Sequence, residues 1–327
     1  MNIFITGANG FIGKALAQRI AQLDCWPDGR RIRRLTLLDL EHEDPVDGDS
    51  RVHLLSGCVS DPSILDAALS SQPDVVFHLA AVASGRAEDD FELGMSVNLH
   101  ASLRLLDGLA QQGNCPRVVF SSSIAVYGSP LPATISDDTV IAPSMSYGAQ
   151  KRAVELILSD YSRRGLLRAL AVRLPGIVVR PATDNGALSL FTSRLISGLA
   201  RGEPVTLPVS GEATVWLMSL PRCLDNLMWA AQFELPAHQC NYAWTLPCMR
   251  VSIRDIVAHF SKATAGRAEG LVHYEPQPDI QAMFGHLPPL TSTQAQGLGF
   301  QADASLGELI HRSLPHPTIT IKTTETP

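Results

Sequence analysis

Apolar and polar positions follow two different periods over the first 180 residues of the chain. Short runs of consecutive apolar residues are typical of strands that are buried on both faces of a parallel sheet. They predict six strands, at residues 2–6, 35–40, 52–55, 74–79, 117–122 and 168–174. Between them, apolar residues three and four positions apart predict helices over 11–23, 61–69, 88–112 and 146–164.

Strands that alternate with helices predict an α/β fold, a doubly wound parallel sheet of the Rossmann type. Beyond about residue 181 the pattern loosens, and proline and glycine become frequent. We therefore predict a dinucleotide-binding domain over residues 1–181, a smaller C-terminal substrate lobe over 182–314 and a loose tail over 315–327. Ligands of such sheets bind beyond the carboxyl ends of the strands.

A glycine-rich turn follows the first predicted strand and opens the first helix. Its sequence, GANGFIG, places glycines at Gly7, Gly10 and Gly13. Glycines there permit a tight turn and close approach of a pyrophosphate, which the free N–H groups of a helix N-terminus favour. The order of strand, turn and helix predicts dinucleotide binding, and a purely structural turn is the alternative.

Asp39 ends the second predicted strand, 26 residues after Gly13. A carboxylate at this place accepts hydrogen bonds from the adenosine ribose and repels a 2′-phosphate, which favours NAD over NADP. Arginines at positions 30, 31, 33 and 34 keep NADP as a lesser alternative. An aspartate that only caps a turn is the structural alternative.

Tyr147 and Lys151 are four residues apart, on one face of a predicted helix, and serines 121–123 close the fifth strand. An ammonium beside a tyrosine stabilises the phenolate and lowers a pKa that is ordinarily about 10. We predict that Tyr147 exchanges a proton with a substrate hydroxyl while a hydride passes to the cofactor. Lys151 would hold the nicotinamide ribose, and one serine would orient the substrate oxygen. A surface tyrosine–lysine pair and a polar strand end are the alternatives.

Four segments together resemble the extended short-chain dehydrogenase/reductase family, of the NAD-dependent epimerase/dehydratase type: TGANGFIG, HLAA at 78–81, FSSSIAVYG at 120–128 and YGAQK at 147–151. The resemblance covers about 180 residues and implies that Ser123, Tyr147 and Lys151 are catalytic. It implies a homodimer formed through the two long helices. It also implies a set of NAD contacts: Gly7, Gly10, Phe11, Ile12, Gly13, Asp39, Val59, Ala80, Asn98, Tyr147 and Lys151. One departure is Cys58, in a place where members carry an aspartate that bonds to adenine.

The second lobe narrows the substrate class. Family members that act on nucleotide sugars carry an arginine before an aspartate and an aromatic residue, and that arginine pairs with the diphosphate. No arginine precedes Trp216 in the corresponding segment, so a smaller substrate is implied. Segments 173–181, 185–187 and 214–222 resemble the D-erythronate dehydrogenases of this family, which oxidise a small 2-hydroxy acid with NAD. The resemblance leads us to expect substrate contacts from Ser84, Ser123, Tyr147, Asn185 and Arg222, whereas Arg180 and Arg222 are solvated in the alternative interpretation.

Composition excludes other classes. Lys and Arg total 26 against 32 Asp and Glu, and this net charge of −6 argues against a nucleic-acid partner. Six cysteines without a CxxC pair predict reduced thiols and no metal site. No apolar run is long enough to cross a bilayer and no export signal is visible, so we expect a cytoplasmic protein without a membrane partner.

Three alternative functions stay open. A nucleotide-sugar epimerase or dehydratase is disfavoured by the missing arginine. A non-catalytic NAD(H)-binding regulator would not need Ser123, Tyr147 and Lys151. An L-threonine-type dehydrogenase would need a partner for the substrate ammonium, which the sequence does not identify.

Overall fold

A seven-stranded, fully parallel sheet forms the centre of the large domain in the computed structural model, which describes residues 1–42, 48–181, 190–235 and 239–314. The strand order is β3-β2-β1-β4-β5-β6-β10. The strands are β1 (Asn2–Thr6), β2 (Arg34–Asp39), β3 (Val52–Ser56), β4 (Val75–His78), β5 (Arg117–Ser123), β6 (Arg168–Leu174) and β10 (Ala243–Thr245). The predicted doubly wound parallel sheet is therefore confirmed.

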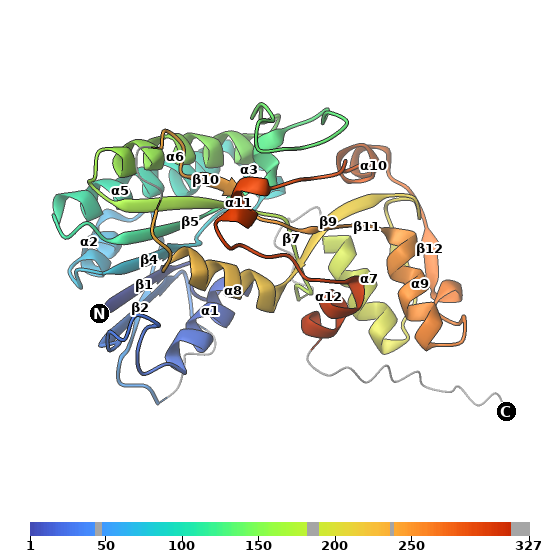
Figure 1. The fold of residues 1–327 in the computed structure, drawn as a ribbon, viewed down its shortest axis with the longest axis horizontal. Coiled ribbons are helices and arrows are strands. Elements are labelled where there is room, and N and C mark those ends of the chain that lie inside the picture. Colours follow the sequence, from blue (N-terminus) through green and yellow to red (C-terminus); the bar gives the residue numbers. More distant parts are fainter. Residues whose placement is uncertain (43–47, 182–189, 236–238, 315–327) are drawn as a thin grey trace.

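Helices cover both faces of this sheet (Figure 1). On one face lie α1 (Phe11–Ala21) and α8 (Leu220–Ala230). On the other lie α2 (Pro62–Leu69), α5 (Ala101–Gln111) and α6 (Ser146–Arg163). The β1, β4 and β5 residues between the two layers are almost fully buried, which explains why their sequences are apolar at consecutive positions.

The single helix predicted over 88–112 is wrong. The segment forms α3 (Ser84–Asp89), α4 (Phe91–Gly94), a π-helical stretch (Met95–His100) and α5. Asp90 separates the first two helices, because its side chain accepts a hydrogen bond from the backbone of Leu93 and caps α4. The π-helical stretch then carries Asn98 towards the loop that follows β4.

The smaller lobe has its own hydrophobic core and two small sheets. Its strands are β7 (Gly176–Val178), β8 (Val205–Leu207), β9 (Thr214–Ser219), β11 (Met249–Ser252) and β12 (Val272–Tyr274). Its helices include α7 (Phe191–Arg201), α9 (Ile253–Ala263), α10 (Pro278–Phe284) and α12 (Leu306–Ser313), and α11 (Thr293–Gly297) contacts β10. Ser252 and Asp255 form a capping box that begins α9.

The predicted boundary at residue 181 does not separate the two lobes. After β9 the chain returns to the large domain, where α8 packs on α1 and β10 extends the sheet beside β6. Leu227 and Trp244 belong to the core of the large domain. The substrate lobe is therefore discontinuous in sequence. The sequence did not indicate this, because β10 has only three residues and so short an apolar run predicts no strand. The predicted tail, 315–327, lies outside the described residues.

Candidate active site

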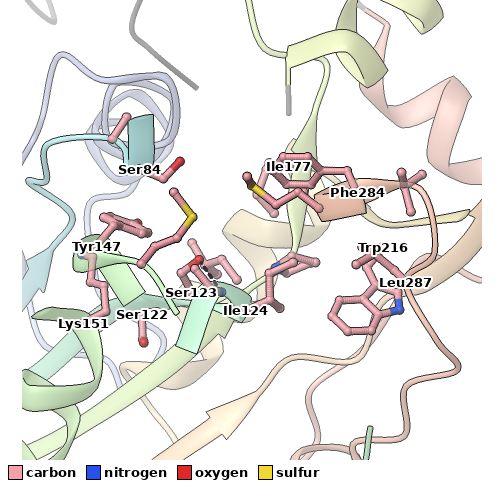
Figure 2. Close-up of a pocket in the computed structure, with 18 of the residues that line it drawn as sticks. Ser84, Ser122, Ser123, Ile124, Tyr147, Lys151, Ile177, Trp216, Phe284 and Leu287 are labelled. Carbon is pink, nitrogen blue, oxygen red and sulfur yellow. Dashed lines mark hydrogen bonds between the residues drawn. The ribbon is translucent and has the colours of Figure 1, made fainter. Parts of the chain in front are cut away.

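A cavity of about 580 Å³ lies at the carboxyl edge of the large sheet, between the two lobes. Its lining comes from the glycine turn, the end of β5, the start of α6, and the β7, β9 and α10 segments of the small lobe. Figure 2 shows the polar Ser84, Ser123 and Tyr147 on one side and the apolar Ile177 and Phe284 on the other. The large domain therefore supplies hydroxyl groups to the cavity, and the small lobe supplies mostly apolar side chains.

The glycine turn has the form that a dinucleotide phosphate requires. A Cβ atom on Gly13 would lie 1.9 Å from the carbonyl oxygen of Gly7, so the helix packs directly against the turn. Gly7 has φ of +70°, and a Cβ there would lie 2.7 Å from the backbone nitrogen of Ala80. The cradle-forming residues Gly7, Gly10, Phe11, Ile12 and Gly13 all line the cavity at the N-terminus of α1. The turn therefore fits the pyrophosphate of NAD.

Asp39 ends β2 beside this turn. Its Oδ2 accepts the N–H of Asn9 at 2.7 Å, and its Oδ1 accepts the N–H of Leu40 at 2.7 Å. The carboxylate is half-buried, and each oxygen keeps acceptor capacity for a ribose hydroxyl. The structure thus places Asp39 next to the glycine turn, as an adenosine-ribose contact requires.

Three other predicted cofactor residues lie behind the cavity surface. Val59 is buried in the large core, and the N–H of Ala80 donates to Thr6 Oγ1 at 3.2 Å. Asn98 is 1 % exposed; its Oδ1 accepts the N–H of Val82 at 2.8 Å and its Nδ2 donates to Gln150 Oε1 at 2.8 Å. These hydrogen bonds hold the loop after β4, and the cofactor contact of Asn98 stays a prediction.

Ser123, Tyr147 and Lys151 come together on the large-domain side of the cavity. Tyr147 lies in the first turn of α6 and hydrogen-bonds to Ser123, the last residue of β5. Lys151 is 1 % exposed; its Nζ donates to the Ser121 carbonyl at 2.8 Å and lies 5.7 Å from the Tyr147 ring centroid. The structure therefore brings together the three side chains that the sequence and the family resemblance singled out.

The electrostatics of Tyr147 differ from the sequence prediction. Burial raises the pKa of Tyr147 above its ordinary value, while the Arg180 guanidinium and the hydrogen bond to Ser123 act to lower it. Burial also lowers the pKa of Lys151 to about 7, against the opposing charge of Glu155. The predicted lowering of the Tyr147 pKa by Lys151 is therefore wrong, and the cation that acts on Tyr147 is Arg180.

Arg180 lines the cavity just beyond β7, although it is not among the substrate contacts expected from the sequence. The signal that could have identified it is its position directly after a short apolar run, Ile177–Val179, which continues the chain from the carboxyl edge of β6. Ligands of a doubly wound sheet bind beyond the carboxyl ends of its strands, and the segment that follows β6 starts at that edge.

The predicted substrate contacts have three different outcomes. Ser84 begins α3 and lines the cavity. Asn185 lies outside the described residues. The predicted substrate contact of Arg222 is wrong, because this residue is absent from the cavity lining. Its guanidinium donates to Gln301 at 2.8 Å and to Glu308 at 3.2 Å. Arg222 lies on α8, which packs against the large domain, so it takes part in an ion-pair network away from the site.

The described part of the chain contains no cluster of three or more His, Cys, Asp or Glu side chains that could hold a metal ion. No described helix is both long enough and apolar enough to cross a membrane. All six cysteines are free thiols.

Residues 3–217 match the model of the NAD dependent epimerase/dehydratase family. The chain belongs to this family. Its members are NAD-dependent, and the cradle of Gly7, Gly10 and Gly13 described above accommodates that cofactor. The protein is therefore an NAD-dependent oxidoreductase that acts on a CH–OH group.

Named relatives match the chain over nearly its full length. It is 39 % identical to D-erythronate dehydrogenase of Cupriavidus necator, over 95 % of this chain and 97 % of that protein. It is 31 % identical to D-erythronate dehydrogenase of Haemophilus influenzae, over 97 % of this chain and 99 % of that protein. Among solved structures, the nucleoside-diphosphate-sugar epimerase from Agrobacterium tumefaciens is 34 % identical, with a TM-score of 0.88 over 95 % of this chain and 92 % of that one. The names of these relatives cover two substrate classes within one family.

Proposed function

We propose that this family member oxidises a small 2-hydroxy acid at its C2 hydroxyl to the 2-keto acid, with Tyr147 as general base and D-erythronate as the leading substrate. The observation that carries the proposal is the charge of the cavity. Its described lining contains the basic side chains of Lys151 and Arg180 and no carboxylate. Such a lining favours a small anion, and the two relatives named D-erythronate dehydrogenase support the choice of acid.

Ser123 orients the C2 oxygen, and Tyr147 takes its proton. The Ser123 Oγ accepts the N–H of Ala125 at 3.1 Å, so its own hydrogen is available for Tyr147 or for the substrate oxygen. Tyr147 lies in the first turn of the 18-residue helix α6, where the helix dipole favours a negative charge. The phenolate takes the proton of the C2 hydroxyl, and Ser123 holds that oxygen as it becomes the keto group. When bound, NAD supplies the acceptor for the C2 hydride.

The small-lobe side of the cavity argues against a nucleotide sugar. Strand β9 presents Val215, Trp216 and Leu217 to the cavity, and the indole Nε1 of Trp216 already donates to the Pro288 carbonyl at 2.8 Å. A diphosphate bound there would lack a guanidinium partner in β9. Because the same cavity includes the phosphate turn of the cofactor, the room left for the substrate suits a short acid.

An amino-acid substrate is also disfavoured. The ammonium group of L-threonine requires an acidic or carbonyl partner, and no carboxylate occurs among the described lining residues. A 2-hydroxy acid carries the same carboxylate without the ammonium. The proposed homodimer and a cytoplasmic location rest on the family resemblance and the composition.

The test is NAD reduction followed at 25 °C with D-erythronate, its uncharged polyol erythritol, L-threonine and UDP-glucose. We expect turnover of the acid at a kcat/KM at least about tenfold above that of erythritol, because the anchored anion orients the reacting carbon. Equal turnover of acid and polyol, or turnover of UDP-glucose or L-threonine in place of the acid, would refute the proposal.

A further inference from the structure

Arg180 connects the two lobes at the cavity. Its backbone N–H donates to Ser193 Oγ at 3.0 Å, on helix α7 of the small lobe. Its guanidinium carbon lies 5.9 Å from the ring centroid of Phe11, in the first turn of α1. The backbone of Arg180 therefore contacts one lobe and its guanidinium lies near the other.

The guanidinium of Arg180 lacks the carboxylate partner that Arg173 and Arg222 have. Arg173 is paired with Glu155 at 2.9 Å, and Arg222 with Glu308 at 3.2 Å. No carboxylate of the described residues forms an ion pair with Arg180, although it is only partly exposed. A half-buried charge without a counter-charge is unfavourable, and an anionic ligand would remove that cost.

We propose that Arg180 binds the carboxylate of the substrate and thereby places C2 against Tyr147; this rests on the proposed function of a 2-hydroxy-acid dehydrogenase. The C1 carboxylate is bonded directly to C2, so its anchor must lie close to the proton acceptor. Arg180 meets this condition, because it lines the same cavity as Tyr147 and its charge acts on the phenol.

Neither a different anchor for the carboxylate nor a different anion for Arg180 fits as well. The Lys151 Nζ is fully buried and bonded to the Ser121 carbonyl. The cofactor phosphates have the free N–H groups at the N-terminus of α1, so they do not need Arg180. A planar guanidinium also binds a carboxylate through two parallel hydrogen bonds, which an ammonium does not reproduce.

The experiment compares Arg180→Gln and Arg180→Lys with the wild-type enzyme. Hydrogen bonds to charged groups contribute about 1.5–3 kcal/mol, so we expect Arg180→Gln to raise the KM for D-erythronate by roughly 10- to 100-fold. Arg180→Lys should recover part of that loss, and the KM for NAD should stay within about twofold. The kcat/KM for erythritol should not fall, so the preference for the acid collapses. Arg254→Gln is the matched control, because Arg254 is 69 % exposed, pairs with Glu212 and lies outside the cavity lining.

A binding measurement separates this proposal from the proposed function. Titration calorimetry of D-erythronate into the enzyme–NADH complex, which cannot oxidise it, should show binding by wild type and Arg254→Gln and its loss in Arg180→Gln. Retained NADH binding by Arg180→Gln shows that the variant is folded. A rise confined to the KM for NAD, or unchanged D-erythronate binding by Arg180→Gln, would overturn the role of Arg180. Arginine-dependent binding in an enzyme that oxidises no 2-hydroxy acid would support the carboxylate site and refute only the proposed function.

Discussion

Nδ1 of His78 lies 2.7 Å from Oγ1 of Thr6, so a buried side-chain hydrogen bond joins the neighbouring strands β4 and β1. On its other side the ring bonds to Ser102 through Nε2 at 2.8 Å, and Ser102 donates its own hydrogen to the Asn98 carbonyl at 2.8 Å. Ser102 therefore accepts from Nε2–H, which leaves Nδ1 to accept from Thr6. The chain of bonds requires a neutral imidazole and connects the cofactor edge of the sheet to Asn98.

The first prediction concerns acid stability. Burial, with a contribution from the Lys151 charge, lowers the pKa of His78 from 6.5 to about 3. Between these values the unfolded chain binds a proton that the folded protein does not, so stability falls as the pH falls below about 6.5. We expect His78 to account for a loss of about 2 kcal/mol between pH 7 and pH 5. Urea unfolding of wild type and His78→Asn at both pH values measures this, and an equal pH dependence in the two proteins would contradict it.

The second prediction concerns Tyr147. Tyr147→Phe removes the proton acceptor and should lower kcat by about two to four decades, with NAD binding largely unchanged. Tyr161→Phe is the control, because Tyr161 lies on the same helix, bonds to Asp107 and is absent from the cavity lining. Because burial raises the pKa of Tyr147, the oxidation rate of the wild type should still be rising above neutral pH. Near-normal turnover by Tyr147→Phe would remove this residue from the mechanism.

The third prediction concerns cofactor choice. Asp39→Asn removes the charge but retains an oxygen that can accept the N–H of Asn9. It should raise the KM for NAD by about tenfold and improve the use of NADP, since the repulsion of a 2′-phosphate is relieved. The ratio of kcat/KM for the two cofactors measures the effect. A wild-type enzyme without a preference for NAD would show that Asp39 does not contact the ribose.

The fourth prediction concerns the support of β5. Glu155 is fully buried, binds Arg173 through two contacts of 2.9 Å and accepts from Ser122 Oγ at 2.6 Å. Glu155→Gln leaves Arg173 as a buried charge without its partner, and we expect a loss of about 3–5 kcal/mol in unfolding free energy. Arg152→Gln, which removes only a partly exposed pair with Glu155, should cost about 1 kcal/mol or less. Similar urea midpoints for the two variants would contradict this assignment.

The fifth prediction concerns assembly. Leu156 and Ile157 on α6 are 54 % and 42 % exposed, and α6 is one of the two long helices through which the family resemblance implies dimerisation. Buried apolar area of this kind is typical of stable homodimer interfaces. We expect a homodimer by light scattering at micromolar concentration, and a monomer for the double variant Leu156→Glu, Ile157→Glu. Leu166→Glu, an exposed leucine beyond the end of α6, should stay dimeric. A monomeric wild type would contradict the prediction.

The sequence predicted those elements that depend on residues close together in the chain. The strand–turn–helix unit around Gly7 and Gly13 was predictable because the glycine spacing, the apolar strand and the helical period lie within about 20 residues. The cap of α2 was signalled by Asp61 and Pro62, and Asp61 accepts the N–H of Ser63 as a capping residue does. The Tyr147–Lys151 pair followed from the helical repeat alone.

Tertiary structure decided what depends on contacts between distant residues. Strand β10 joins the sheet because β6, about 70 residues earlier, offers a free edge. The three residues of β10 are too few to show the apolar pattern that predicts a strand. Arg180 and Arg222 look equivalent in the sequence, each near a strand end, yet one lines the cavity and the other pairs with Glu308. Which arginine lines the cavity depends on where β7 and α8 pack, and that packing is set by burial of their apolar faces in the folded protein. The sequence by itself therefore determined the cofactor turn and the Tyr147–Lys151 pair, whereas the packing of the two lobes determined which charges face the cavity.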